Sequence, residues 1–272
     1  IAEWTGTPYE KLRFLAAGVN HMAFLLKLEA DGQDLYPKLR ACLDRPEIYK
    51  KEKVRFEILR HFGYFPTESS GHNSEYLPYF RKRQDLIDRF CSQDFPEVEE
   101  NGIDWNSMSA GVSGASVQIC RGLQIRNEKQ IAGYLDGSRE IDLASSVEYG
   151  VQIIAAIEKN RPLAANLNVM NRGLIATLPP ECCVEVPCLV DGGGIVPGRI
   201  EDFPEQLAAI DRGMVGAQIL GAQGALDGDR RAIFHAIAAD PNTQSKLGLD
   251  EIRSMTDELF DALADVIDPR FS

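Results

Sequence analysis

Two of the four histidines in the sequence stand among other polar side chains. His21 follows Asn20 at a break in an apolar run, and His72 shares one short segment with Glu75 and Tyr76. Imidazole is a common ligand for divalent metal ions, and a carboxylate can bind the same ion or orient the ring. A tyrosine can act as a base where a nearby cation lowers its pKa. The two segments are therefore candidates for metal binding and proton transfer.

Several other chemistries lack their motifs in this sequence. The chain contains neither the glycine pattern of a dinucleotide-binding domain nor a phosphate-binding P-loop, and it has no serine-hydrolase elbow, HExxH zinc motif or EF-hand loop. The triple glycine at 192–194 is expected to join two strands, where it offers no helix N-terminus to a phosphate. The sequence thus predicts no dinucleotide site of its own.

Hydrophobic spacing predicts the elements that position the two segments. Residues 12–28 are apolar and strand-like, with an interruption at 18–21 that contains the first histidine. Residues 51–62 have one apolar helical face, and Gly63 is placed to end that helix. Residues 64–80 lose this period, so we expect a loop or irregular strand that carries the second candidate segment.

The second half of the chain mixes helices and strands. Residues 92–140 are polar, glycine-rich and weakly periodic, which predicts a mobile excursion or linker. The remaining pattern predicts a helix over 145–158 capped by Ser145, strands over 163–175 and 182–190, and helical apolar faces over 207–217 and 252–266. Because strands and helices do not alternate regularly, the α+β class is favoured over α/β.

Composition narrows the class of protein. The chain has 272 residues, of which 44% are hydrophobic and 26% charged, and a formal net charge of -12. This acidic balance argues against nucleic acid or an anionic membrane as a partner. No apolar run reaches the roughly 20 residues of a membrane helix, and no basic segment precedes an apolar run at the N-terminus. Six cysteines without metal-site or disulfide spacing predict reduced thiols and a cytoplasmic location.

Four blocks of the sequence resemble family 4 of the glycoside hydrolases. They are the Gly-Val-Asn-His motif that begins at Gly18 and the segments 63–76, 166–197 and 240–252. The likeness covers nearly the whole chain, is weakest over 92–140, and is most similar to the α-galactosidase and uronic-acid branch. The resemblance implies that 1–272 is a C-terminal substrate domain of the lactate-dehydrogenase-like type.

The resemblance also implies an unusual mechanism. Members hold NAD⁺ and a divalent metal, typically Mn²⁺, and they associate as homodimers or tetramers. NAD⁺ oxidises the C3 hydroxyl of the sugar, a base removes the C2 proton, and the aglycone is eliminated from C1. Water then adds and the ketone is reduced again.

Individual roles can be carried onto this chain from the family motifs. The resemblance makes His21 a metal ligand, Asn20 a substrate contact, and Tyr76 the catalytic base, with Tyr79 as the second choice for that base. His72 and Glu75 would line the same sugar pocket. These assignments are implied by the resemblance and are expectations for the structure.

One departure from the family is as informative as the matches. The family's N-terminal NAD-binding domain and its upstream Cys-His metal motif are absent from this chain. We therefore expect that 1–272 alone shows no turnover and belongs to a larger enzyme.

Two alternatives to an enzyme of this family remain open at this stage. The first is a non-enzymatic sugar-binding or subunit-assembly module. The second is a dehydrogenase of the lactate or malate type, although the sequence lacks that proton relay and its substrate arginine. The sugar is also undecided between galactoside, glucoside and the uronides. A basic turn at 81–83 could reach a uronate carboxylate, or it could simply be solvated.

Overall fold

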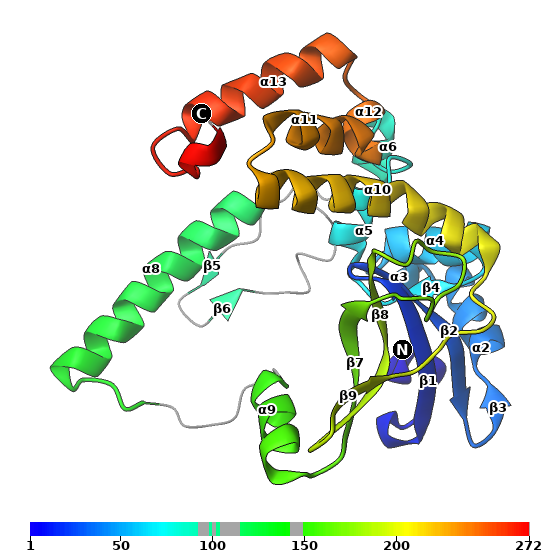
Figure 1. The fold of residues 1–272 in the computed structure, drawn as a ribbon. Coiled ribbons are helices and arrows are strands. Elements are labelled where there is room, and N and C mark those ends of the chain that lie inside the picture. The colour runs from blue at the N-terminus through cyan, green and yellow to red at the C-terminus, as the bar shows by residue number, and fades with distance from the viewer. Residues whose placement is uncertain (92–97, 100–101, 104–114, 142–148, 272) are drawn as a thin grey trace.

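The computed structural model of the chain describes residues 1–91, 98–99, 102–103, 115–141 and 149–271. Its centre is an antiparallel sheet whose strands differ in length, with helices packed around it, as Figure 1 shows. The strands of this sheet are β1 (Leu12–Val19), β2 (Met22–Ala30), β3 (Gln33–Asp34), β4 (Phe65–Pro66), β7 (Leu163–Met170), β8 (Cys183–Asp191) and β9 (Gly194–Pro197). A separate two-stranded ribbon pairs β5 (Val98–Glu99) with β6 (Gly102–Ile103). The expected α+β class is confirmed.

Helices make up most of the remaining described chain. The N-terminal part contains α1 (Ala2–Thr5), α2 (Tyr36–Ala41), α3 (Pro46–Tyr49), α4 (Lys53–Phe62), α5 (Ser70–Tyr76) and α6 (Gln84–Phe90). The rest contains α8 (Ala115–Asp136), α9 (Gly150–Lys159), α10 (Glu205–Asp227), α11 (Arg230–Ala239), α12 (Pro241–Gln244) and α13 (Leu249–Ala262). Among the described residues, no helix combines the length and apolar character needed to cross a membrane.

The order of the main strands is β3-β2-β1-β8-β7, with β4 beside β2 and β9 beside β8. The strands β1 and β2 form a hairpin in which Val19 pairs with Met22, so Asn20 and His21 are its two-residue loop. The first half of the chain joins the second where Gly18 of β1 pairs with Glu185 of β8. The hairpin loop therefore lies at the end of the central strand pair.

Apolar side chains pack on both faces of this sheet. Because side chains alternate along a strand, Phe24 of β2 joins one cluster with Val186 and with Leu207 of α10, while Leu25 joins another with Leu39 of α2. The helix α4 contributes side chains to both clusters. This helix ends at Gly63, which has a φ of 88°, as its position in the sequence predicts.

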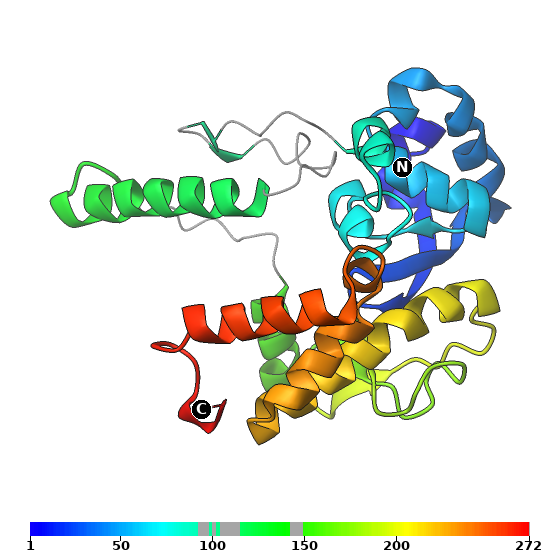
Figure 2. The ribbon, with the colours of Figure 1, turned by 90° about the horizontal axis from the view of Figure 1, so that it is seen from above.

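One sequence prediction about local structure is wrong. Residues 70–76, expected as loop or irregular strand, form the helix α5, because Ser69 caps it and its small polar side chains are buried. Within the expected excursion or linker over 92–140, which stays a prediction, residues 115–136 form the helix α8, which projects away from the sheet and the other helices in Figures 1 and 2. The other residues of the expected excursion lie largely outside the described part of the chain.

The remaining expected elements are present with shifted ends. The predicted helix over 145–158 is seen as α9 from Gly150, and its expected cap Ser145 lies outside the described residues. The predicted strands correspond to β7 and β8, and the triple glycine connects β8 with β9 as expected. The two predicted C-terminal apolar faces belong to α10 and α13. Figure 1 shows α11 lying between α10 and α13, and this helix packs against both.

Candidate active site

The β1–β2 hairpin positions His21 at the edge of the sheet. His21 takes a left-handed backbone conformation with φ of 65°, which histidine adopts more readily than most residues. Val19 and Met22 on either side of the loop are buried, so the ends of the loop are fixed by the core. The side chain of His21 is 35% exposed. Its imidazole is therefore reachable by a ligand while its backbone is held in place.

The helix α5 brings the second candidate segment to this loop. The Ser69 hydroxyl caps the helix by accepting a hydrogen bond from the His72 N–H at 3.3 Å. His72 and Tyr76 are four residues apart and therefore share one face of the helix. Between them, Asn73 is completely buried, and its amide Nδ2 donates to the His21 carbonyl at 3.3 Å. This bond joins α5 directly to the hairpin loop.

The side chains of His21, His72 and Tyr76 form one cluster. The His21 Nδ1 and Tyr76 Oη atoms lie 3.0 Å apart, within hydrogen-bonding distance. The two imidazole rings are stacked, with centroids 4.8 Å apart and planes inclined by 10°. The Tyr76 ring meets the His21 ring edge-on at 5.7 Å. Three residues chosen from the sequence are thus brought together by the fold.

Glu68 completes the cluster, although the sequence analysis assigned it no role. Its Oε1 lies 3.2 Å from His72 Nδ1, and its Oε2 lies 3.8 Å from His21 Nε2. Burial raises the pKa of the Glu68 carboxyl, but the Ser69 N–H and the two imidazoles lower it by more, so the net shift is downward. Glu68 is therefore held as a carboxylate between the two rings. Its spacing of four residues from His72 would have indicated this contact had α5 been predicted.

The donor atoms of this cluster suit a divalent cation. Within the described residues, one ligand atom each from His21, Glu68 and His72 lies within 4.8 Å of the others. Two imidazole nitrogens and a carboxylate oxygen are ligands that Mn²⁺ and similar ions accept. All three side chains are partly exposed, so an ion could enter from solvent. The residues present thus fit the metal that the sequence resemblance implies.

The surroundings of Tyr76 favour its protonated form. Burial raises the pKa of its phenol, and the negative charges of Glu75, Glu68 and Asp240 raise it further. A cation held beside Glu68 would act in the opposite direction because it favours the phenolate. The cluster therefore contains both a candidate base and the group that could hold its activator.

The other residues expected at the site lie around this cluster. Asn20 is exposed in the hairpin loop beside His21. Glu75 is exposed on α5 and lies 4.0 Å from the Arg81 guanidinium, outside the cluster. Tyr79 is 48% exposed and packs against the Phe62 ring. Of the two candidate tyrosines, Tyr76 is the one that contacts His21.

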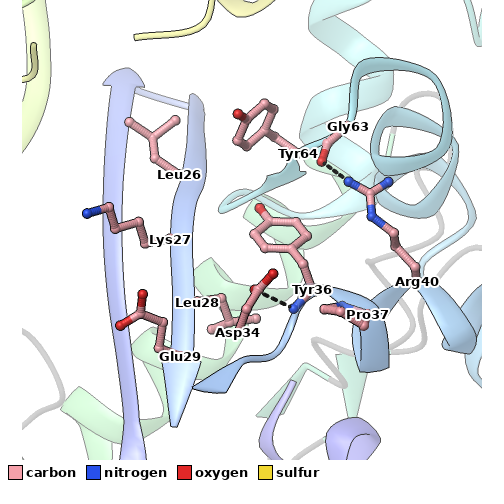
Figure 3. A pocket seen from close by; sticks show the side chains of 10 residues that line it. All are labelled: Leu26, Lys27, Leu28, Glu29, Asp34, Tyr36, Pro37, Arg40, Gly63 and Tyr64. Atoms are coloured by element: carbon pink, nitrogen blue, oxygen red, sulfur yellow. Dashed lines mark hydrogen bonds between the residues drawn. The ribbon is translucent and has the colours of Figure 1, made fainter. Parts of the chain in front are cut away.

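A cavity of about 530 Å³ lies elsewhere, at the outer edge of β2, and Figure 3 shows its lining. Tyr36, Arg40 and Tyr64 line it, and none of the cluster residues does. The Tyr36 hydroxyl donates to the Leu25 carbonyl and accepts from the Phe65 N–H. Burial raises the pKa of Tyr36 to about 12. Its phenol thus stays protonated and joins β2, β4 and α2, which is a structural role.

Comparison with known proteins identifies the family of the chain. A sequence model described as the family 4 glycosyl hydrolase C-terminal domain matches residues 16–243, most of the chain. The chain belongs to family 4 of the glycosyl hydrolases. The match includes all four cluster residues and both halves of the sheet. The α+β fold described above is thus that of the C-terminal domain of this family.

Individual relatives give the same assignment. An α-galactosidase of Bacillus subtilis (strain 168) is 35% identical over 261 residues, which are 96% of this chain and 56% of that protein. An α-galactosidase of Rhizobium meliloti (strain 1021) is 30% identical, over 97% of this chain and 52% of that protein. The chain therefore spans about half the length of the curated relatives it matches.

The fold itself is shared with solved structures of low sequence identity. A 6-phospho-alpha-glucosidase from gut microorganisms, solved in complex with NAD and Mn²⁺, superposes with a TM-score of 0.69 at 14% identity. The superposition covers 96% of this chain and 57% of that one. At this level of identity the likeness describes the fold.

Proposed function

We propose that this chain is the substrate- and metal-binding part of an enzyme that hydrolyses α-glycosides with the help of NAD and Mn²⁺. The observation that carries the proposal is the hydrogen-bonding distance between His21 Nδ1 and Tyr76 Oη, 3.0 Å. It places the expected metal ligand and the expected base in direct contact. A module that only bound sugar or a partner would not need a tyrosine at that position.

His21, Glu68 and His72 would hold the metal, which when bound would polarise the oxygens of the sugar and favour loss of the neighbouring proton. No motif or described site for NAD exists in the chain, so we place that cofactor, which would supply the hydride acceptor, on a part of the protein outside it. The residues of the chain account for the remaining work of binding and proton transfer.

Tyr76 would remove the C2 proton of the sugar. A neutral imidazole donates from one nitrogen and accepts at the other. If Nε2 of His21 held the metal, Nδ1 would carry the proton and would donate to Tyr76 Oη. This bond stabilises a phenolate, because hydrogen bonds to a charged group favour the charged form. His21 thereby couples metal binding to the basicity of Tyr76.

Neighbouring residues would hold His21, His72 and Tyr76 in position. Asn73 ties α5 to the hairpin through the His21 carbonyl, and Ser69 caps the helix that carries both His72 and Tyr76. Asn20 and Glu75 lie at the rim, where they could contact the sugar or its aglycone. We propose further that the whole enzyme works as a homodimer or tetramer.

The proposal is tested with the full-length protein. Purified enzyme is assayed on a panel of aryl α-glycosides with NAD⁺, Mn²⁺ and a thiol reductant, and again after chelation. We expect turnover that disappears with a chelator and returns with Mn²⁺. The 272-residue chain alone is expected to show no turnover, because it lacks the hydride acceptor. Turnover that persists without NAD⁺ or metal would contradict the proposal.

A further inference from the structure

A second polar group lies on the sheet next to the cluster. Along β8, Val184 and Val186 are completely buried in the core, so the intervening Glu185 projects from the opposite face. The Glu185 carboxylate accepts a hydrogen bond from the amide of Asn166 on β7, at 3.5 Å. The same amide also donates to the Ala16 carbonyl of β1 at 3.3 Å. Glu185 is thus a half-buried carboxylate fixed between three strands.

The pairing of the strands directs Glu185 toward the hairpin loop. Glu185 lies directly opposite Gly18 in the β1–β8 pair. Gly18 is three residues before His21. Side chains of directly paired residues lie on the same face, and here the partner has none. A Cβ at Gly18 would come within 2.5 Å of the Met22 carbonyl oxygen, so this position stays bare. The residue of β1 directly opposite Glu185 therefore contributes no side chain.

The charges of Glu68 and His21 act on Glu185. Burial raises the pKa of its carboxyl, the Asn166 hydrogen bond lowers it, the charge of Glu68 raises it and that of His21 lowers it. Together with the pairing of Glu185 opposite Gly18, this places Glu185 beside the hairpin loop that carries His21. The negative charges of Glu75, Glu68 and Asp240 likewise raise the pKa of Tyr76. Apart from His21, the charged side chains named here as shifting the pKa values of Glu185 and Tyr76 are all carboxylates.

Two of the three basic residues of the turn at 81–83, which could have received a uronate, are engaged elsewhere. Arg81 is buried, with its Nε donating to the Ser74 hydroxyl at 2.9 Å and its guanidinium 4.0 Å from Glu75. Arg83 makes a bidentate pair with Asp85, at 2.9 Å for each bond. The side chains of Arg81 and Arg83 are therefore bound to partners on α5 and α6.

We propose that Glu185 is a specificity-determining residue that, together with Asn166, receives hydroxyl groups of an uncharged sugar and excludes a uronate or a sugar phosphate. The Glu185 carboxylate and the amide oxygen of Asn166 can accept hydrogen bonds from sugar hydroxyls, whereas an anionic substituent has no proton to donate and would meet the like charge of Glu185. This inference rests on the proposed function and names its substrate class.

The test compares a neutral substrate with an anionic one on the full-length holoenzyme. The ratio of kcat/KM for an aryl α-galactoside over the matching α-galacturonide is measured for the wild type, Glu185→Gln and Glu181→Gln. Glu181 is an exposed carboxylate just before β8 and serves as the matched control. We expect the wild type to prefer the galactoside, the ratio to fall by about tenfold or more in Glu185→Gln, and no change in Glu181→Gln.

A second measurement needs only the wild type, so it stands even if Glu185→Gln does not fold. Raising NaCl from about 0.05 to 0.5 M should increase kcat/KM for the galacturonide and leave that for the galactoside nearly constant, because salt screens the repulsion. A galacturonide or 6-phosphogalactoside that is cleaved better than the galactoside would overturn the inference. So would an unchanged ratio in a folded Glu185→Gln enzyme.

Failure of the proposed function is distinguishable from failure of this inference. If no α-glycoside is cleaved, the proposed function is wrong. Calorimetry with galactose and galacturonate in the presence of Mn²⁺ then decides whether the site prefers a neutral or an anionic sugar. Tighter binding of galactose that is weakened in Glu185→Gln supports the inference. Equal or tighter binding of galacturonate to the wild type rejects it.

Discussion

His21 Nδ1 and Tyr76 Oη lie 3.0 Å apart although 55 residues separate them in the chain. Two local structures produce this contact: a two-residue hairpin loop that presents His21, and the face of α5 that presents Tyr76. The buried amide of Asn73 joins them through the His21 carbonyl. Because the contact is anchored by the core on both sides, it is a fixed feature of the domain that a substrate meets already formed.

Replacing Tyr76 with phenylalanine tests its role as the base. Tyr76→Phe removes the phenol oxygen and keeps the ring that packs on His21, so the fold should persist. In the full-length enzyme we expect kcat to fall by about 100-fold or more, the usual contribution of a positioned general base, with KM changed only slightly. Tyr79→Phe, at the exposed tyrosine that packs on Phe62, is the control and should retain near wild-type kcat. Equal effects of the two changes would refute the assignment.

Metal binding should depend on Glu68, which the sequence analysis did not single out. Glu68→Gln keeps the size of the side chain but removes the charge between the two imidazoles, so we expect the affinity for Mn²⁺ to fall by about tenfold or more. Isothermal titration of the metal-free enzyme measures it, and the rise in Tm on adding Mn²⁺ should shrink in parallel. Glu75→Gln, on the same segment but outside the cluster, should bind as the wild type does. Unchanged affinity in Glu68→Gln would remove Glu68 from the site.

The hairpin and α4 could be predicted because their apolar residues follow the pattern of the element. The stretch over 12–28 is apolar and continuously buried directly on both sides of its interruption, and Gly63 ends α4 where a left-handed residue is required. Long apolar strands and capped amphipathic helices carry their own signal in the sequence. Burial in the structure follows the same spacing.

The helix α5 could not be predicted in this way, and neither could the role of Glu68. Its buried residues are Ser70, Gly71, Asn73 and Ser74, none of which gives an apolar period. These residues favour turns and caps in isolation, and tertiary contacts override that preference here. Without the helix, the four-residue spacing of Glu68 and His72 has no geometric meaning. The position of Glu185 likewise depends on which strands pair, which spacing along one strand does not reveal.

The hairpin that presents His21 should require glycine at position 18. Gly18 has a φ of 150°, and a Cβ there would lie 2.5 Å from the Met22 oxygen and 2.7 Å from the Ala23 Cα, both backbone atoms. We expect Gly18→Ala to reduce the free energy of unfolding by about 1–3 kcal/mol through this overpacking and to weaken Mn²⁺ binding by moving the loop. Urea unfolding and calorimetry measure the two effects.

Gly32→Ala in the next hairpin is the matched control for that change. Gly32 also has a positive φ, 75°, but nothing lies within 4 Å of the added Cβ. The Gly32→Ala variant should therefore lose only about 1 kcal/mol of stability, the cost of a left-handed backbone at alanine, and should keep its affinity for Mn²⁺. If Gly32→Ala weakened metal binding as much as Gly18→Ala, the effect would come from general destabilisation rather than from the position of His21.

A buried carboxyl on α10 should make the stability of the protein depend on pH. Asp211 is completely buried on the face that carries Leu207 and Met214, and no described residue hydrogen-bonds to either of its carboxyl oxygens. Burial raises the pKa of Asp211 well above the ordinary value of 3.8. The folded state thus holds this proton more tightly than the unfolded state does. The contribution of Asp211 to the free energy of unfolding is therefore fully present below the unfolded pKa, and it is lost as the pH rises from there toward the folded pKa.

Asp211→Asn removes this titration and keeps the shape of the side chain. We expect the variant to match the wild type near pH 4 and to gain on it by up to about 1.4 kcal/mol for each pH unit above the unfolded pKa, because the folded wild type must retain a proton that Asn does not need. Thermal unfolding followed across this range measures the difference, with Asp261→Asn, at an exposed position of α13, as the control. A wild-type and variant pair whose Tm values differ by the same amount at every pH would show that Asp211 does not titrate in the folded protein, since only a proton bound in one state and not the other makes the difference vary.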